Sequence, residues 1–391
     1  MDYKWPPVLP ELGEIVKTYI DSGMPLSIPD ESGIIKEFEQ NYASLHGVKY
    51  ALAVSSGTMA LYSAFFAIGL SEGDEVICTS YSYHATAAPL LHFGVCIVFC
   101  DVEPDTGNID AHNIEALISS KTKAIVTNDQ WGHPCDKELI INICKKHGLK
   151  YIEDCSHAHF SEYKNRYTGT FGDVSCFSLQ GKKLLSGGEG GILLTDNQDI
   201  YERAVLLGHN LKRPSQSVKN SLYKPLERTG YGLKLRMHPL AAVIVNYQLN
   251  NYCFGWIKSR TETLNYFQNK LEGTFLQPMA IKEYVTSMGA WYGYMPRIDS
   301  KYIVDRKHFV SWMNSKGLDA SIPKSRPLTD YELFYPDRFK INSFLKHSVS
   351  KCVNAERYHN SLISFPTFSF NEYEIIDRYA MAIREYMEEF L

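Results

Sequence analysis

The stretch CFSLQGKKLLSGGEGG, residues 176–191, contains two adjacent lysines between an apolar run and four glycines that flank one glutamate. A lysine amine withdrawn from water can attack carbonyl carbons and pass protons, so covalent chemistry is one use of such a stretch. The stretch does not follow the P-loop order, in which glycines precede the lysine, nor the spacing of a dinucleotide fingerprint. A mobile glycine loop with solvated lysines is the plain alternative.

A second polar group ends an apolar, strand-like run and comprises Glu153, Asp154, Cys155, His157 and His159. Asp, Cys and His can bind zinc, which gives one interpretation. Strand-like alternation would place both histidines on one face and Asp154 on the other, so these groups would not easily converge on a metal. A second interpretation is one buried carboxylate aimed at a cationic ring nitrogen, with a histidine beside it. The third is a strand end whose polar groups are satisfied by the backbone.

A third candidate is VSSGTMAL, in which Ser56, Gly57 and Thr58 stand between a strand-like run and a helical pattern. The first amides of a helix lack partners and its N-terminus is positive, so small residues there can cradle a phosphate. The alternative is an ordinary N-cap followed by a glycine turn.

A repeating strand–helix pattern, with a helix expected at 85–94 among others, starts at about residue 50 and must position these groups. Its continuous apolar strands are typical of a parallel sheet with helices on both faces. Ligands bind such sheets beyond the carboxyl ends of the strands, which indicates the polar segments that follow strand-like runs: residues 55–58, 80–86, 128–134 and 153–159. After about residue 250 the pattern becomes mixed. We therefore predict an α/β fold: a large three-layer αβα domain with a mostly parallel sheet at 1–250, and a smaller α+β domain at 251–391.

Composition narrows the class of protein. With 45% hydrophobic residues, 21% charged residues and a net charge of −4, the chain is an ordinary globular protein without a nucleic-acid footprint. Its nine cysteines form no CxxC pair, and their odd number argues against a complete disulfide framework, so we expect a cytoplasmic protein. We expect no signal peptide and no membrane-spanning helix, because neither pattern occurs.

The three groups follow one another as a phosphate-binding turn, an acid at a strand end, and a lysine about thirty residues later. In this order the chain resembles the DegT/DnrJ/EryC1/StrS family of sugar and cyclitol aminotransferases. The motifs that carry the resemblance are AVSSGTMAL, GLSEGDEVICTSYSYHATAAPLLHFG, VFCDVEPDTGNID, YIEDCSHAHFSEYKNRYTGTFGDVSCFSLQGKKLLSGGEGG and RMHPLAA. It is close over residues 30–250 and looser beyond them. It implies the aspartate-aminotransferase fold (fold type I) and the cofactor pyridoxal 5′-phosphate.

The resemblance also implies roles for single residues. The family's Schiff-base lysine stands five residues before the glycine that is Gly188 here, which selects Lys183 and not Lys182. Asp154 would pair with the pyridinium nitrogen and keep the ring protonated. Lys183 and Asp154 are therefore the expected catalytic residues. His157 takes the position of the family's usual glutamine, near the phenolic oxygen of the cofactor.

Further residues are implied to surround the cofactor. Tyr83 corresponds to the aromatic side chain that stacks on the ring, and Ser178 to the serine that binds the phosphate. Lys234 replaces an asparagine that a neighbouring subunit contributes in many relatives, which implies a homodimer with shared active sites. Gln180 is implied to lie near the substrate. The whole expected cofactor site comprises Ser56, Gly57, Thr58, Tyr83, Asp154, His157, Ser178, Lys183 and Lys234.

The resemblance implies an aminotransferase that converts a keto group of a sugar, nucleotide-linked, or of a cyclitol to an amine, with glutamate or glutamine as amino donor and no metal. A dehydratase of the same fold is a rival, but such members carry histidine in place of the lysine. A non-catalytic regulatory protein would be expected to have lost Asp154 or Lys183. A metal-dependent hydrolase is a third rival. Residues 321–335 and 363–370 depart from the family's usual strings, so we expect an unusual keto acceptor.

Overall fold

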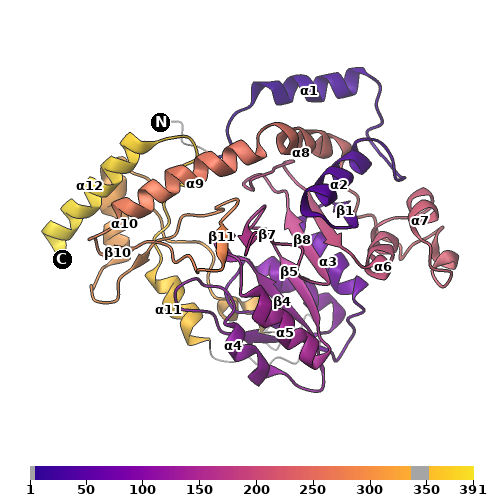
Figure 1. Cartoon of the computed structure of the whole chain (residues 1–391), viewed down its shortest axis with the longest axis horizontal. Coiled ribbons are helices and arrows are strands. Elements are labelled where there is room, and N and C mark those ends of the chain that lie inside the picture. The colour runs from indigo at the N-terminus through magenta and orange to yellow at the C-terminus, as the bar shows by residue number, and fades with distance from the viewer. Residues whose placement is uncertain (1–4, 336–351) are drawn as a thin grey trace.

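The protein is represented by a computed structural model that describes residues 5–335 and 352–391 (Figure 1). At its centre lies a seven-stranded sheet with the strand order β1-β9-β8-β5-β4-β2-β3. Every strand is parallel to the others except β9, which runs antiparallel to both of its neighbours. The predicted, mostly parallel sheet is therefore confirmed. Its strands are β1 Tyr50–Val54, β2 Glu75–Thr79, β3 Cys96–Cys100, β4 Thr122–Asn128, β5 Lys150–Asp154, β8 Val174–Ser178 and β9 Gly191–Thr195.

The direction of β9 follows from its connection to β8. Parallel neighbours need a crossover, whereas residues 179–190 between these strands contain no helix. Two backbone hydrogen bonds close this connection, from Leu179 N to Gly190 O and from Gly181 N to Gly188 O, both 2.9 Å. Gly188 has a φ of 83°, a left-handed conformation that glycine adopts without strain. The two lysines therefore lie on a tight chain reversal, not on a loose loop.

Helices cover both faces of the sheet. Alternate strand residues face opposite layers: Leu52 and Val54 join the apolar cluster that contains α3, whereas Ala51 and Ala53 join the cluster that contains α2. A third cluster packs the strands near β4 against α4 and α5. This is the predicted three-layer arrangement. The covering helices are α2 Gly33–His46, α3 Gly57–Ala67, α4 Ala111–Ile114, α5 Lys137–His147, α6 Gln198–Gly208 and α8 Pro239–Asn251, with α1 Pro10–Asp21 and α7 Lys212–Ser217 outside them.

One predicted helix is wrong. Residues 85–94 form two 3₁₀ helices, His84–Thr86 and Ala88–Phe93. Pro89 has no amide hydrogen to donate, so a continuous α-helix through this segment would lack a hydrogen bond.

The C-terminal elements gather on one side of the sheet (Figure 1). The expected start of the smaller domain falls at the junction between α8 and α9. Residues 1–4 and 336–351, which belong to the two expected domains, lie outside the described residues. The elements of this region are α9 Cys253–Lys270, α10 Arg306–Ser315, α11 Val353–Ser361 and α12 Tyr373–Phe390, with strands β10 Leu276–Gln277, β11 Val285–Ser287 and β12 Arg297–Ile298; β11 pairs with β6 Glu162–Tyr163, which pairs with β7 Arg166–Tyr167.

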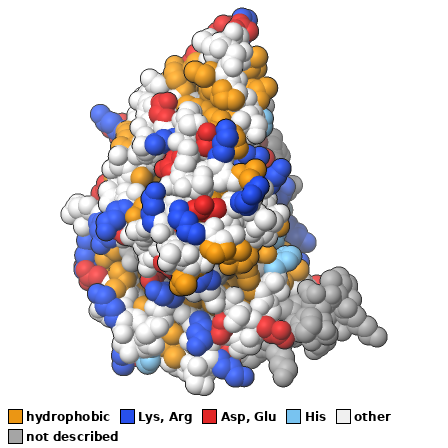
Figure 2. Space-filling view, turned by 90° about the vertical axis from the view of Figure 1, so that its right-hand side faces the viewer, with side chains coloured by type: hydrophobic (Ala, Val, Ile, Leu, Met, Phe, Trp, Pro, Cys, Tyr) orange, Lys and Arg blue, Asp and Glu red, His pale blue; other side chains and the backbone are white. Residues whose placement is uncertain are grey.

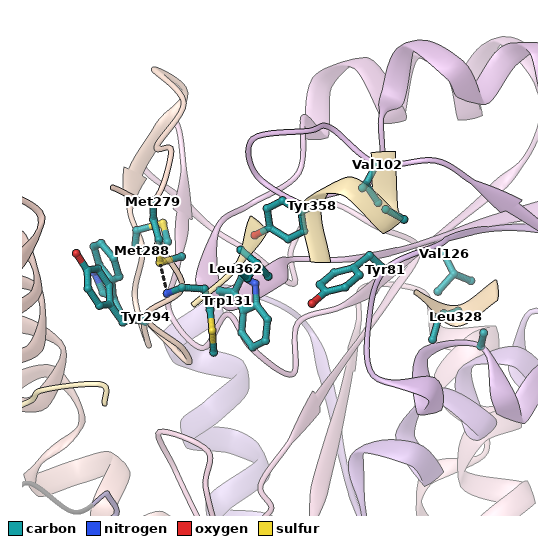
Figure 3. Close-up of a cluster of buried hydrophobic side chains, with 14 of the residues drawn as sticks. Tyr81, Val102, Val126, Trp131, Met279, Met288, Tyr294, Leu328, Tyr358 and Leu362 are labelled. Carbon is teal, nitrogen blue, oxygen red and sulfur yellow. Dashed lines mark hydrogen bonds between the residues drawn. The ribbon is translucent and has the colours of Figure 1, made fainter. Parts of the chain in front are cut away.

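An apolar cluster joins this region to the sheet (Figure 3). Trp131, which follows β4, lies in the same cluster as Met279, Met288, Tyr294 and Tyr358 from the C-terminal region. The two parts therefore share one core at the end of the sheet where the strands of the parallel set finish. Among the described helices, none is both long and apolar enough to span a membrane.

Candidate active site

A cavity of about 1060 Å³ lies between the carboxyl ends of the strands and the C-terminal region. The C-terminal side contributes Tyr292 and parts of the two divergent segments, residues 321–325 and 364–367. These are the segments whose departure from the family's strings predicts an unusual keto acceptor, and both reach this cavity. Nine of the ten sequence-predicted site residues also line it: Ser56, Gly57, Thr58, Tyr83, Asp154, His157, Ser178, Gln180 and Lys183.

The N-terminus of α3 and the end of β8 meet at one side of the cavity. Ser56 is the N-cap of α3, and its hydroxyl accepts a hydrogen bond from Met59 N at 3.1 Å. A Cβ atom added to Gly57 would lie 2.7 Å from Cβ of Ser178, so only glycine allows this approach. The free amides that begin α3 and the Ser178 hydroxyl thus share one small region, which can hold a phosphate. The same residues can therefore serve both as the predicted N-cap and as the predicted anion site.

Asp154 ends β5 and is buried. Its Oδ2 accepts a hydrogen bond from the Thr86 hydroxyl at 2.7 Å, and its Oδ1 accepts one from Ser156 N at 3.1 Å. Because Thr86 donates its only hydroxyl hydrogen to the carboxylate, the Ser82 hydroxyl donates to Thr86, at 2.6 Å. These neutral donors stabilise an ionised carboxylate that lines the cavity. Sequence reasoning missed the role of Thr86. The sequence indicates this role only by the presence of a hydroxyl side chain shortly after a strand.

Lys183 is buried, whereas its neighbour Lys182 is exposed. Lys183 N donates to Gln180 O at 2.8 Å, which closes the turn that carries both lysines, and both line the cavity. Burial lowers the pKa of the Lys183 amine to about 7, against the opposing effect of the negative charge on Asp154. Such an amine is present in both protonation states at neutral pH, so it can act as a nucleophile and can transfer protons.

His157 is buried and lies nearly parallel to two other rings. Its ring centroid is 4.0 Å from that of Tyr292 and 5.4 Å from that of Trp131. Burial, and secondly the positive charge of Lys183, lower the pKa of His157 well below its usual range, so the imidazole is neutral. Sequence reasoning placed a polar segment around Trp131 at the cavity but assigned no role to it, and it missed Tyr292.

His159 is a structural residue that holds the end of β8. Its Nε2 lies 2.9 Å from the Ser178 carbonyl oxygen, which can only accept, so Nε2 carries the hydrogen. Its Nδ1 then accepts from the Tyr42 hydroxyl at 2.8 Å. Burial lowers the pKa of His159 to about 3, so the ring stays neutral. Both ring nitrogens are used, which removes this residue from the metal-binding interpretation.

A lysine occupies the centre of the potential metal ligands. Within the described ranges, 5–335 and 352–391, one group of such side chains converges, and it consists of Asp129, Glu153 and Cys155. Lys137 Nζ lies 2.6 and 2.8 Å from the two carboxylate oxygens of Asp129 and 2.9 Å from Glu153. Lys137 thus pairs with both carboxylates from the position that a metal ion would take, so the arrangement is that of a structural support beneath the cavity.

The remaining predicted residues lie at the edge of the cavity or outside it. Tyr83 lines the cavity and remains 54% exposed, which is unusual for an aromatic side chain beside a core. Gln180 is exposed, and its side-chain oxygen accepts from Lys182 N at 3.1 Å. Lys234 is exposed and does not line the cavity of its own chain.

Sequence comparison connects this geometry to known proteins. The sequence profile of the DegT/DnrJ/EryC1/StrS aminotransferase family matches residues 30–384. The chain belongs to this family. Among its relatives, the spore coat polysaccharide biosynthesis protein SpsC of Bacillus subtilis (strain 168) is 33% identical over 297 residues, 74% of each chain. GDP-perosamine synthase of Escherichia coli O157:H7 is 41% identical over 178 residues, 46% of this chain and 49% of that enzyme, so the match spans about half of that relative.

Solved structures of aminotransferases share the whole fold. The X-ray structure of an aminotransferase from Psychrobacter cryohalolentis superposes with a TM-score of 0.85 at 25% identity and covers 98% of both chains. PseC of Helicobacter pylori, an aminotransferase involved in the biosynthesis of pseudoaminic acid, gives 0.84 at 25% identity over 99% of both chains. The predicted family and fold type are therefore confirmed, and the family is one of aminotransferases.

Proposed function

We propose that this member of the family transfers an amino group from glutamate or glutamine to a keto group on a sugar, in nucleotide-linked form, or on a cyclitol, with pyridoxal phosphate as cofactor. The observation that carries the proposal is a buried amine, Lys183, in the same cavity as a buried carboxylate, Asp154, and an anion cradle. Relatives named as GDP-perosamine synthase and as putative L-glutamine:3-amino-2,3-dideoxy-scyllo-inosose aminotransferase of Micromonospora echinospora support the two acceptor classes.

The cavity fits the proposed cofactor. A phosphate can be held by the first amides of α3 and by Ser178, a protonated ring nitrogen by Asp154, and a flat ring by the exposed face of Tyr83. When bound, the cofactor supplies an electron sink that stabilises a carbanion next to nitrogen. The two groups that donate hydrogen bonds to the Asp154 carboxylate, the Thr86 hydroxyl and the Ser156 amide, are both neutral.

The chain's own residues would act around that group. Lys183 would bind the cofactor covalently. When released, its amine would take a proton from the donor carbon and deliver that proton to a second carbon, and its pKa of about 7 favours both transfers. Asp154, whose carboxylate is oriented by its two hydrogen bonds, would pair with the ring nitrogen. Neutral His157 would donate to an oxygen on the ring edge.

The decisive experiment is borohydride reduction of the purified protein followed by peptide mass spectrometry. We expect the reduced cofactor on Lys183, no adduct in Lys183→Ala, and an unchanged adduct in the matched control Lys182→Ala. An adduct that persists in Lys183→Ala would refute the assignment. Spectral titration with glutamate and with glutamine would then identify the donor, and release of water from a keto-deoxysugar without amine transfer would favour the dehydratase alternative.

We infer a homodimer in which the partner's Lys234 completes the phosphate site. Lys234 is exposed. The face that carries α6 and α7 shows hydrophobic side chains among charged ones (Figure 2). Apolar area of this kind on a soluble chain marks a contact surface. The exposed apolar residues of this region are Leu211, Leu222, Tyr231 and Leu233.

We also infer a division of the chain into domains at residues 1–250 and 251–391, and a cytoplasmic location. The domain boundary is supported by the junction of α8 and α9, and by the cavity that lies between the two parts. The location is supported by the nine cysteines, which form no disulfide and are mostly buried, as in a reducing compartment.

A further inference from the structure

Tyr292 lies between β11 and β12, more than a hundred residues from Lys183 in the sequence, yet its ring covers the Lys183 amine. The Lys183 Nζ atom is 3.8 Å from the centroid of the Tyr292 ring. Both residues line the same cavity. An ammonium group this close to an aromatic face is attracted by the negative charge density of the ring, most strongly where water is excluded.

Two parallel rings fix the orientation of Tyr292. Its ring plane is within 15° of His157 at a centroid distance of 4.0 Å, and within 7° of Trp131 at 6.3 Å. Trp131 is itself held in the apolar cluster with Met288 and Tyr358 (Figure 3). The Tyr292 ring is therefore aligned by a core that does not depend on any ligand.

The main chain around Tyr292 is held equally firmly. Ala290 N donates to His159 O at 2.9 Å, and the Ala290 carbonyl accepts from the buried guanidinium of Arg260. On the other side, a Cβ atom added to Gly293 would lie 2.7 Å from the Trp131 ring, so glycine is needed for this packing. The segment cannot shift without breaking contacts to both the sheet and α9.

The groups that face the Lys183 amine come from several elements. Asp154, at the end of β5, carries the opposing negative charge. His157 is neutral and Tyr83 lies across the cavity, while Lys182 on the same turn is exposed. Among these, the Tyr292 ring is the neighbour for which a direct contact with Nζ is recorded.

We propose that Tyr292 is a positioning residue, whose ring holds the Lys183 amine beside the cofactor at every stage in which that amine is not covalently bound. The inference rests on the proposed function, in which the lysine alternates between a covalent link and a free amine. A free amine on a flexible four-carbon chain would otherwise sample many positions, and proton transfer needs one. Because Tyr292 belongs to the C-terminal part, the contact also ties that part to the chemistry of the sheet.

The test measures the titration of the Lys183 amine itself. The full-length protein, freed of cofactor, is acetylated with acetic anhydride at a series of pH values, and the acetyl fraction at Lys183 and Lys182 is quantified by mass spectrometry. Exposed Lys182 is the internal reference. Tyr292→Phe retains the aromatic face, whereas Tyr292→Leu retains apolar bulk without it. Tyr266→Leu is the matched control, because it removes a surface cation–π pair with Lys270.

The ring face stabilises the protonated amine, so we expect the Lys183 midpoint of Tyr292→Leu to fall by about half a unit to one and a half units. Tyr292→Phe and Tyr266→Leu should match the wild type, and Lys182 should not move in any variant. If Tyr292 had only a structural role, its substitution would lower the thermal unfolding temperature, but the Lys183 midpoint would not differ between Tyr292→Leu and Tyr292→Phe. If Leu does not fold, Tyr292→Met removes the same ring face.

An unchanged midpoint in Tyr292→Leu, or equal shifts in Leu and Phe, would overturn the inference. Neither result would touch the proposed function, which is decided by the reduced adduct on Lys183 in the wild-type protein. Absence of that adduct in the wild-type protein would instead refute the proposed function. The effect of Tyr292 on the Lys183 midpoint would then describe the cavity without bearing on that function.

Discussion

At the scale of single residues, chemistry depends on burial more than on residue type. Lys182 and Lys183 are identical side chains on one turn, but only Lys183 is buried beside Asp154. Removing a charged amine from water disfavours its protonated form, so the same burial that makes Lys183 reactive also lowers the stability of the fold. Both consequences can be measured.

The first prediction concerns this cost of burial. The pKa of Lys183 is lowered to about 7 in the folded protein from 10.5. Between these values the unfolded chain binds more protons, so stability should rise as the pH rises from 7 toward 10. In the cofactor-free protein, Lys183→Met should therefore increase the free energy of unfolding by about 2–4 kcal/mol at pH 7, and by less at pH 9.5.

Urea denaturation at both pH values measures this difference. Lys182→Met, at the exposed neighbour, should change little at either pH. A gain from Lys183→Met that stays constant between pH 7 and 9.5 would show that the amine is not the cause.

The second prediction concerns Thr86, which donates to the Asp154 carboxylate at 2.7 Å. A hydrogen bond to a charged group contributes about 1.5–3 kcal/mol, so Thr86→Val should lower kcat/KM by roughly tenfold or more. Ser82→Ala removes the donor one step further out and should have a smaller effect. Steady-state kinetics and thermal unfolding should be measured together for both variants. Equal losses of kcat/KM in Thr86→Val and Ser82→Ala that follow their losses of stability would contradict the prediction.

At the scale of elements, the site depends on how closely α3 approaches β8. This approach uses Gly57, where a side chain would meet Ser178, and the end of β8 is fixed by His159. The His159 ring connects the Ser178 carbonyl to the Tyr42 hydroxyl in α2. The phosphate region is therefore positioned by contacts from both faces of the sheet.

The third prediction follows from the space at Gly57. In Gly57→Ala, a Cβ atom 2.7 Å from Cβ of Ser178 must move α3 or β8, at a cost of about 1–3 kcal/mol. We expect roughly ten- to a hundredfold weaker binding of pyridoxal phosphate, measured by absorbance titration.

Gly255 in α9 is the matched control, because nothing lies within 4 Å of a Cβ atom added there. Gly255→Ala should leave cofactor affinity unchanged and should be neutral or stabilising, since alanine favours a helix. Wild-type affinity in Gly57→Ala would show that the cradle tolerates movement.

At the scale of the whole molecule, the site lies where the sheet and the C-terminal region meet. In the proposed homodimer, a second copy of the chain adds Lys234. The sheet provides Lys183 and Asp154, and the C-terminal region provides Tyr292 and the divergent segments at 321–325 and 364–367. These segments form the side of the cavity that an acceptor would contact. We therefore expect their sequences to bear on substrate choice rather than on the transfer chemistry.

The fourth prediction tests whether sites are shared between chains. Lys183→Ala and Lys234→Glu should each be nearly inactive as homodimers. When the two are mixed and allowed to exchange, each heterodimer contains one site with an intact Lys183 and an intact Lys234 from the partner. Activity should return to roughly a quarter of the wild-type level at equal mixing. Activity in Lys234→Glu alone, or no recovery on mixing, would contradict a shared site.

Several features of the fold and the site could be predicted from the sequence. Continuous apolar strands separated by helices predict a covered parallel sheet, and the residues that follow those strands predict the edge where ligands bind. The resemblance to the family, carried by the order of the motifs, implied the roles of Asp154 and Lys183. Such signals are local, because strand–helix alternation and the residues at strand ends are visible within short windows.

Other features were decided only by the tertiary structure. The hydrogen bond from Thr86 to Asp154 and the ring of Tyr292 over Lys183 join residues that are distant in sequence. No window that contains Lys183 indicates that its amine is buried or that its pKa is low. Desolvation depends on which side chains surround a group in space. The motifs thus indicated Lys183 as the amine expected to react, and the packing of the C-terminal part over the sheet set the environment of that amine.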